Sequence, residues 1–356
     1  MHGALFHPRP FVWRLSRPTG GKQEGHVQLR RRRLSLAHQG IDVTESSRIG
    51  VVLSSGGGRG VYAHTGFLLA LEKLGIQPAA IAGCSAGALV GGIAASGMSL
   101  QHWGETIANV HTREYWSPDS WGRFLWRVAV QKGRGYTGLS GTDAAVEFLR
   151  RNLAVQTFEE CPIPFYVIAM NLGRSEKVLF TEGELAPRIM ASAAMPVLYR
   201  PVEIDGELFT DGAVIELAPT EAICCHHNLD ALLVHHTAVH HDGSAGLSYA
   251  LSQPWSLVEI LYLLLYRQRP WYMSDAPLVF NRCPAGCGVP IIVVKPELPN
   301  LVWPLSEGGV KVQRSAMEQT ETLLRPYCEV LRTNPSELLA LLGQQAGNVS
   351  RAGSRE

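Results

Sequence analysis

The chain lacks any long hydrophobic run. Its 356 residues contain no stretch of about 18 or more consecutive apolar residues, which is the length that a membrane-spanning helix needs. The basic segment over residues 1–48 also lacks the apolar core of about 7 to 15 residues that a secretory signal carries. We therefore expect a protein without a spanning helix that acts in the cytoplasm, with or without peripheral contact to a membrane.

Cysteine and net charge are also low. The seven cysteines are scattered without the spacing of a disulfide framework, which is typical of a reducing compartment. The net charge of +1 gives no overall signal for a specific nucleic-acid partner. Positive charge is concentrated in residues 1–48, which hold nine Lys and Arg, including Arg30–Arg33, against three Asp and Glu. We expect a mobile extension there, either a solvated tail or an arm that contacts anionic lipid or nucleic acid.

The remaining composition, 46% hydrophobic and 18% charged, is that of an ordinary globular protein. We predict one domain over residues 49–342, with its motifs in residues 49–239 and a helical part over residues 250–342. Residues 343–356 are largely Gly, Ser and other polar residues, so we predict a disordered tail.

Two glycine-rich turns each follow an apolar run. Ile49–Leu53 leads into Gly56-Gly-Gly-Arg-Gly60, and Ala79–Gly83 leads into Gly83-Cys-Ser-Ala-Gly87, each followed by a helical pattern. This alternation predicts an α/β fold with a mostly parallel central sheet flanked by helices on both faces. Both turns then lie at the carboxyl ends of neighbouring strands, where open α/β sheets have their sites.

The second turn has the sequence of a nucleophile elbow. In Gly-X-Ser-X-Gly after a strand, the flanking glycines allow the sharp turn that exposes the serine, here Ser85. The backbone N–H groups of Gly56, Gly57 and Gly58 are suited to stabilise an oxyanion. A dinucleotide loop fits only loosely, and a phosphate-binding Walker loop fails because no Gly-Lys-Ser/Thr follows. The base for the serine is either Asp211 or a histidine.

These motifs in order resemble the patatin-like phospholipases, most closely their bacterial branch related to neuropathy target esterase. The resemblance covers roughly residues 48–239 and includes the segment Ala191–Pro196. It implies a three-layer patatin-like fold and a Ser–Asp dyad without a catalytic histidine, which cleaves acyl esters of phospholipids or lysophospholipids. We expect no cofactor. Ser85 matches the nucleophile and Asp211 the base, so an acyl-enzyme would form on Ser85 and be hydrolysed by water.

The resemblance also assigns the surrounding residues. Gly56 and Gly57, with Gly58 beside them, match the oxyanion donors. The supporting motif residues are Arg59, Gly60, Gly83, Gly87 and Gly212. The chain departs from the family pattern at Ser55, where a glycine is usual, and at Glu216, where an asparagine often stands.

Two other functions stay open. In an α/β-hydrolase the order is Ser, Asp, His, and His240 or His241 would complete that triad. Alternatively, the chain is a lipid-binding module that keeps the fold without turnover. The oligomeric state and the lipid head group are not indicated by any motif.

The segment from Cys224 to His241 is rich in cysteine and histidine. Its spacing matches no zinc pattern with paired ligands, so we predict no metal site there. The histidines in question are His226, His227, His235, His236, His240 and His241. Cys283-Pro-Ala-Gly-Cys287 is predicted to be a loop in which a disulfide forms only after oxidation.

Aromatic residues gather between residues 100 and 150, where helical and irregular patterns alternate. We expect them to form core, with a lipid-facing cap as the alternative. They are Tyr115, Trp116, Trp121, Phe124, Trp126 and Tyr136.

Overall fold

The computed structural model describes residues 47–338 except for 226, 238–242, 253–255, 257–259, 261–262, 264–269, 273, 275, 285, 300 and 302–307. The predicted tail over residues 343–356 and residues 1–46 of the predicted extension lie outside the described residues. The last two residues of that extension contact the folded body. The Ser47 N–H donates to the Arg332 carbonyl (3.1 Å), and the Arg48 N–H donates to the Asp230 carboxylate (2.7 Å).

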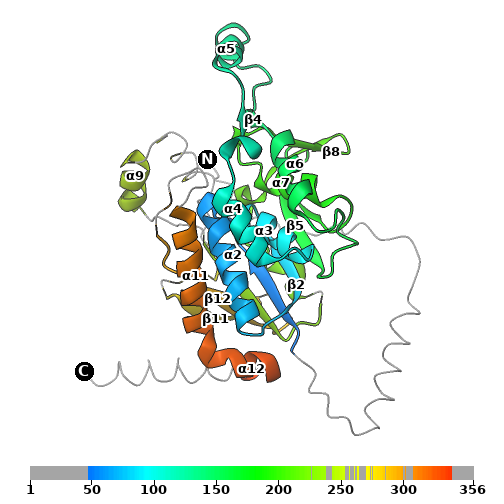
Figure 1. Ribbon diagram of the computed structural model, residues 1–356, viewed down its shortest axis with the longest axis vertical. Coiled ribbons are helices and arrows are strands. Elements are labelled where there is room, and N and C mark those ends of the chain that lie inside the picture. Colours follow the sequence, from blue (N-terminus) through cyan, green and yellow to red (C-terminus); the bar gives the residue numbers. More distant parts are fainter. Residues whose placement is uncertain are drawn as a thin grey trace, which may run out of the picture. The chain divides into compact units, whose positions relative to one another are not determined.

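A nine-stranded sheet forms the centre of the fold (Figure 1). Its strand order is β11-β12-β10-β1-β2-β5-β9-β8, and β6 pairs with β5. The strands are β1 (Ile49–Leu53), β2 (Pro78–Gly83), β5 (Phe165–Asn171), β6 (Glu176–Phe180), β8 (Val202–Ile204), β9 (Glu207–Asp211), β10 (Ala231–His235), β11 (Leu278–Arg282) and β12 (Pro290–Val294).

The middle of the sheet is parallel and both edges are antiparallel. Strands β12, β10, β1, β2 and β5 run parallel to one another. On one side β11 pairs antiparallel with β12, and on the other side β6 and β9 pair antiparallel with β5, and β8 pairs antiparallel with β9. The predicted α/β fold with a parallel centre is confirmed. The hairpin turn between β8 and β9 has left-handed φ angles at Asp205 (52°) and Gly206 (79°), as the Asp-Gly pair favours.

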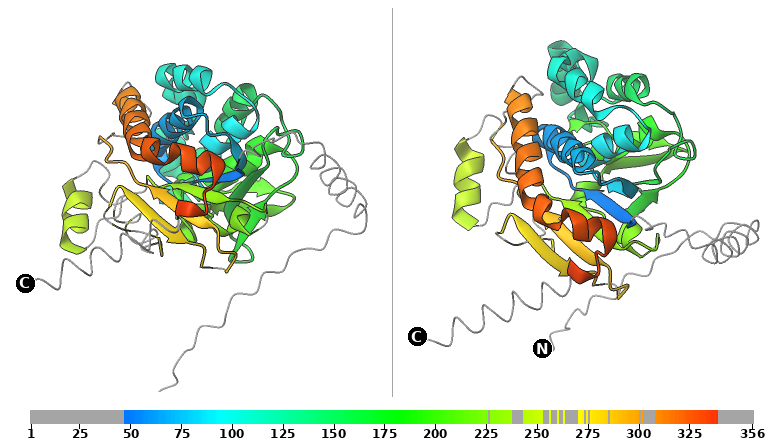
Figure 2. Two further views of the ribbon diagram at one scale, coloured as in Figure 1. Left: turned by 90° about the horizontal axis from the view of Figure 1, so that it is seen from below. Right: turned by 60° about the horizontal axis from the view of Figure 1, so that its bottom comes forward.

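Most helices cover one face of this sheet. They are α2 (Gly57–Lys73), α3 (Ala86–Ala95), α4 (Leu100–Asn109), α6 (Asp143–Asn152), α7 (Leu185–Ala193) and α11 (Gly308–Leu324). Figure 2 shows α11 lying alongside α2, with β11 and β12 at the sheet edge next to them. On the opposite face, the short helix α8 (Glu221–Cys224) packs against the sheet. Two further helices are α9 (Gly243–Ser252) and α12 (Cys328–Thr333).

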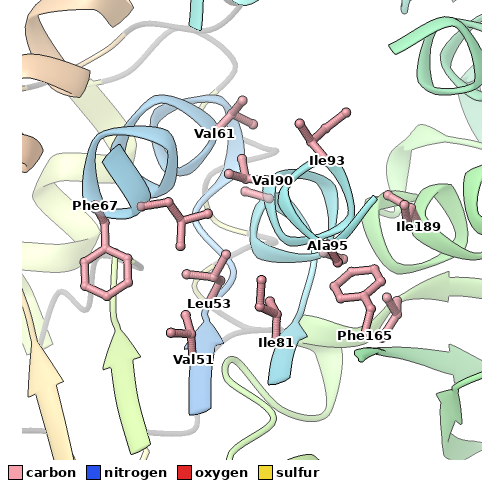
Figure 3. Close-up of a cluster of buried hydrophobic side chains, with 14 of the residues drawn as sticks. Val51, Leu53, Val61, Phe67, Ile81, Val90, Ile93, Ala95, Phe165 and Ile189 are labelled. Atoms are coloured by element: carbon pink, nitrogen blue, oxygen red, sulfur yellow. The ribbon is translucent and has the colours of Figure 1, made fainter. Parts of the chain in front are cut away.

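The two faces of the sheet bury separate hydrophobic clusters. Along β1, Val51 and Leu53 face the larger cluster, whereas Val52 faces the smaller one. This alternation is the two-residue period of a strand that is buried on both sides. In the larger cluster, Ile81 and Phe165 lie beneath α3 (Figure 3). This packing fixes the ends of β1 and β2, from which the two glycine-rich turns emerge.

A small second sheet lies beside the main one. It consists of β3 (Ser117–Pro118), β4 (Gly138–Gly141) and β7 (Val197–Tyr199). Between β3 and β4 the chain forms α5 (Trp121–Leu125) and a π-helical turn over Trp126–Val130, which stand away from the body in Figure 1. Among the described residues, no helix is both long enough and apolar enough to cross a bilayer.

Candidate active site

The elbow around Ser85 has the strained geometry that its sequence predicts. Ser85 has φ 55° and ψ −118°, a left-handed conformation that a non-glycine residue adopts only under constraint from its surroundings. A Cβ added to Gly83 would lie 2.4 Å from the Gly87 carbonyl oxygen, and one added to Gly87 would lie 2.1 Å from the Leu53 carbonyl oxygen. Both flanking positions therefore need glycine, because neighbouring backbone atoms leave no room for a Cβ.

The strand register brings Asp211 to the level of Ser85. Gly83 at the end of β2 is opposite Val167 in β5, and Asp211 at the end of β9 is opposite Ala169 in β5. Phe209 is opposite Asn171 at the carboxyl end of β5, so β9 starts beyond that end and runs back antiparallel to β5 until Asp211 lies beside the elbow. The Ser85 hydroxyl donates to Asp211 Oδ2 at 2.8 Å across 126 sequence positions.

The surroundings of Asp211 set its protonation. Its other carboxylate oxygen, Oδ1, accepts from the Ala213 N–H at 2.9 Å, and the side chain is fully buried. Burial raises the pKa of Asp211 to about 7, against the lowering effect of the hydrogen bonds from Ala213 and Ser85. Gly212 is needed here because an added Cβ would lie 2.6 Å from the Ile168 carbonyl oxygen. A carboxyl with this pKa can exchange a proton with Ser85 near neutral pH.

The glycine loop forms the first turn of α2, next to the elbow. Gly56 caps the helix, and the N–H groups of Gly57 and Gly58 belong to the turn that has no acceptor within the helix. The Gly60 N–H donates to the Gly56 carbonyl at 2.8 Å, and a Cβ added to Gly60 would lie 3.0 Å from Ala86 Cβ. The start of α2 therefore lies against the start of α3, so both positive helix ends face the same region.

Ser55 fits this loop without strain. Position 57 favours glycine because its φ of 57° is in the left-handed region, whereas Ser55 is outside that region. The Ser55 N–H donates to the Leu217 carbonyl at 2.7 Å. Arg59 supports the loop through a bond from Nη2 to the Thr237 carbonyl at 3.1 Å. The departure from the family pattern at Ser55 is thus compatible with the loop geometry, and Glu216 forms an ion pair with Lys177 at 2.6 Å.

Two contributors to the site were missed by sequence reasoning. The Ser85 backbone N–H donates to Ser192 Oγ at 2.9 Å, so Ser192 holds the strained elbow. Ser192 lies within the recognised segment Ala191–Pro196, but its role as an acceptor could not be inferred from that segment. Thr237 holds the other turn, because its N–H donates to Ser54 Oγ (3.0 Å) and its hydroxyl donates to the Ser55 carbonyl (3.2 Å).

The described histidines make their hydrogen bonds away from the Ser85–Asp211 pair. His64 and His235 share a buried Nδ1–Nδ1 hydrogen bond of 2.8 Å, and burial lowers the pKa of both, that of His64 to about 4. His227 bonds the Tyr166 hydroxyl (2.6 Å), and His236 bonds the Tyr272 hydroxyl (3.1 Å). The remaining triad candidates lie outside the described residues, namely His226, His240 and His241.

The four cysteines that sequence spacing treats as two separate pairs lie together. The sulfur atoms of Cys224, Cys225, Cys283 and Cys287 are all within 4.8 Å of one another. Spacing could not predict this group, because the two pairs are far apart in sequence and meet only when β11 and β12 form at the sheet edge. Among the described residues, the histidines of this segment are not part of the group.

Known proteins resemble this chain over the residues that contain these motifs. Residues 51–223 match the family model described as Patatin-like phospholipase. An uncharacterized NTE family protein of Mycobacterium tuberculosis is 31% identical over 182 residues, which cover 51% of this chain and 46% of that protein. Lysophospholipase NTE1 of Cryptococcus neoformans is 28% identical over 178 residues, which cover 49% of this chain and 10% of that protein.

Among solved structures, human GIVD cytosolic phospholipase A2 aligns with a TM-score of 0.48 at 11% identity, covering 87% of this chain and 64% of that one. On this match, residues 51–223 form a patatin-like phospholipase domain, as the motifs predicted. The chain spans about half the length of the mycobacterial relatives and a tenth of the fungal one.

Proposed function

We propose that this protein is a serine acyl hydrolase that cleaves fatty-acyl esters of phospholipids or lysophospholipids. The observation that carries the proposal is the 2.8 Å hydrogen bond from the strained Ser85 hydroxyl to the buried Asp211 carboxylate. The family match supports an ester substrate, and the name of the fungal relative, a lysophospholipase, supports the lysophospholipid class.

In the proposed reaction, Asp211 accepts the Ser85 proton as the hydroxyl oxygen attacks the ester carbonyl. The Gly56–Gly58 backbone and the start of α3 stabilise the oxyanion, and each such donor is worth about 3 kcal/mol in comparable sites. Collapse of the intermediate expels the alcohol, which takes the proton from Asp211, and leaves the acyl group on Ser85. Water then attacks this ester, again with Asp211 as base, and releases the fatty acid.

Access to the site supports the same reaction. Ser85 is only 4% exposed and Asp211 is fully buried, whereas residues 56–59 are partly exposed. A substrate carbonyl would therefore approach along the glycine loop, where an added Cβ at Gly57 would meet nothing within 4 Å. Excluding water from Asp211 strengthens it as a base.

The protruding segment between β3 and β4 extends the proposal to peripheral contact with an anionic membrane. Leu125, Trp126 and Val130 are 57%, 59% and 54% exposed, although they are large and apolar. Residues 121–135 contain four Lys and Arg and no Asp or Glu. Exposed apolar side chains among cations are typical of a segment that enters a lipid headgroup layer.

The segment is also linked to the site. Its return strand β4 pairs with β7, and β7 begins three residues after Ala194, whose carbonyl accepts from the Asp211 N–H at 3.1 Å. Of the aromatic residues expected as core or as a cap, Tyr115 is buried and Trp126 is exposed. The core expectation is confirmed for Tyr115, and the exposure of Trp126 supports the lipid-facing alternative at that residue.

The direct test is a fluorophosphonate probe combined with product analysis on a panel of phospholipids and lysophospholipids. We expect labelling at Ser85 and release of free fatty acid, and we expect Ser85→Ala to lose labelling and at least about 1,000-fold in kcat. Ser99→Ala is the matched control, since Ser99 is an exposed serine that caps α4, and it should keep both. A chain that binds lipid but takes no label would be the non-catalytic module instead.

A further inference from the structure

The four clustered cysteines come from two parts of the fold. Cys224 is the last residue of α8, and Cys225 follows it as the helix cap. Cys283 and Cys287 lie in the loop that joins β11 to β12, and Cys283 lies 59 positions after Cys224. All seven cysteines of the chain are free, and these four share one location.

The sulfur positions fit the corners of a tetrahedron around a metal ion. The Sγ–Sγ distances are 3.4 Å for Cys224–Cys225, 3.4 Å for Cys224–Cys283 and 3.9 Å for Cys225–Cys283. A zinc ion with four Zn–S bonds of about 2.3 Å separates its sulfurs by about 3.8 Å. A disulfide would give each sulfur one partner, whereas each of these three sulfurs approaches two others. One shared centre therefore explains the arrangement better than two separate pairs.

The loop between the strands is built to present two sulfurs to one point. The Cys283 N–H donates to the Val289 carbonyl at 3.0 Å, which closes the loop. Gly286 and Gly288 have left-handed φ angles of 87° and 75°, and they turn the chain so that Cys287 returns beside Cys283. Cys224 and Cys283 are buried, whereas Cys225 and Cys287 are exposed, so an ion can enter from solvent.

The electrostatics of the cluster favour a cation. Cys224 is buried, with the sulfurs of Cys225 and Cys283 both at 3.4 Å, so a lone thiolate is unfavourable there. A divalent cation supplies the positive charge that several thiolates need, and binding releases the thiol protons.

We propose that Cys224, Cys225, Cys283 and Cys287 bind one zinc ion in a closed structural site. The ion would fasten α8, a helix of only four residues, to the β11–β12 hairpin at the sheet edge. So short a helix has little stability of its own. In the sequence α8 lies between β9 and β10, and it contributes to the smaller hydrophobic cluster. The proposal does not depend on ester hydrolysis, because its predictions concern metal content alone.

The first test is the metal content of the full-length chain, purified under reducing conditions without chelators, by inductively coupled plasma mass spectrometry. We expect about one zinc per chain, falling to about a tenth or less in Cys287→Ser. Cys161→Ser is the matched control, because Cys161 is a free, half-buried cysteine outside the cluster, and it should keep the zinc. A wild-type chain without metal, or with these four residues in disulfides, overturns the proposal.

The second test uses the wild-type chain, so it does not depend on how the variants fold. Titration with an organomercurial should release one zinc per four thiols modified, detected with a colorimetric zinc indicator. Replacement of zinc by Co²⁺ should give the visible absorption of a tetrahedral thiolate site, absent in Cys287→Ser. A red protein that contains iron would overturn the assignment of zinc, and an octahedral Co²⁺ spectrum would overturn the four-cysteine site.

Discussion

Ser85 and Asp211 are each held in a state that is unfavourable for an isolated residue. Ser85 has a positive φ, which costs about 1 to 3 kcal/mol, and Asp211 is a carboxyl removed from water. Their surroundings compensate through three hydrogen bonds, from Ser85 N–H to Ser192, from Ser85 Oγ to Asp211 and from Ala213 N–H to Asp211. Strain of this kind is retained where it supports chemistry, which favours a functional role for the pair.

The raised pKa of Asp211 predicts a specific pH profile. Burial raises this pKa to about 7, and only the ionised carboxylate can accept the Ser85 proton. We therefore expect kcat/KM for an acyl ester without ionisable groups to rise about tenfold per pH unit below pH 7 and to level off above it. The measurement is a series of initial rates from pH 5 to 9. A flat profile between pH 5 and 8 would contradict the role of Asp211 as base.

The same pKa makes stability depend on pH in the opposite sense. Between the unfolded value of 3.8 and the folded value of about 7, the folded state binds more protons, so the free energy of unfolding falls as pH rises. Asp211→Asn has no titrating group, and it should gain stability relative to the wild type from pH 5 to 8 while losing turnover. Urea unfolding of the variant and the wild type at pH 5 and at pH 8 measures this difference in stability and shows whether the variant is folded.

Sequence reasoning at this scale identified the groups but not their partners. Ser85 and Asp211 were predicted because each lies in a short motif whose glycines allow the backbone turn at that residue. Ser192 and Thr237 were missed, since an acceptor role depends on which residues the fold brings within 3 Å. The buried pair of His64 and His235 was missed for the same reason, because the two are distant in sequence and neither lies in a motif.

At the scale of elements, close backbone contact between α3 and β1 fixes the elbow. A Cβ added to Gly87 would lie 2.1 Å from the Leu53 carbonyl oxygen and 2.7 Å from the Ser54 carbonyl oxygen. Backbone atoms in the central strand cannot move without disturbing the sheet. Gly92 in the same helix is equally buried, but an added Cβ there would meet the end of the Ile189 side chain at 2.3 Å. A side chain can change rotamer, so the two positions differ.

We predict that Gly87→Ala destabilises the fold by about 3 kcal/mol, since it forces α3 away from β1. Gly92→Ala should lower the free energy of unfolding by about 1 kcal/mol or less, because the Ile189 side chain can change rotamer. The higher helix propensity of alanine stabilises both variants by about the same amount, so it does not affect their difference. The measurement is the midpoint of urea unfolding for both variants and the wild type. Equal losses would mean that the contact with Leu53 does not constrain the elbow.

Elements with a strong local signal were predictable and those without one were not. The apolar runs of β1 and β2 and the Asp205-Gly206 turn were identified, because burial on both faces and turn chemistry leave marks in the sequence. Strand β11 was missed within a segment expected to be helical, since only three of its five residues are apolar and it pairs at the edge. Its pairing with β12 depends on the sheet already being present.

At the scale of the whole molecule, the sequence predicted the α/β fold, but it could not predict which distant surfaces meet. The two cysteine pairs are brought together by sheet order rather than by spacing. The protruding segment is a similar case, because its aromatic residues look like core in the sequence. Burial of Tyr115 and exposure of Trp126 depend on where the chain leaves the body between β3 and β4.

If this segment inserts into a lipid surface, Trp126→Ala should reduce binding to phosphatidylserine-containing vesicles by at least about tenfold, as expected for loss of a buried indole. Its rate on a water-soluble acyl ester should stay unchanged, because residues 121–130 lie outside the Ser85 site. Trp271→Ala is the matched control, since Trp271 is 48% exposed elsewhere on the chain. Vesicle sedimentation at two salt concentrations adds a second readout, because the four cations should make binding weaker at high salt. Equal losses in both tryptophan variants would contradict the proposed contact.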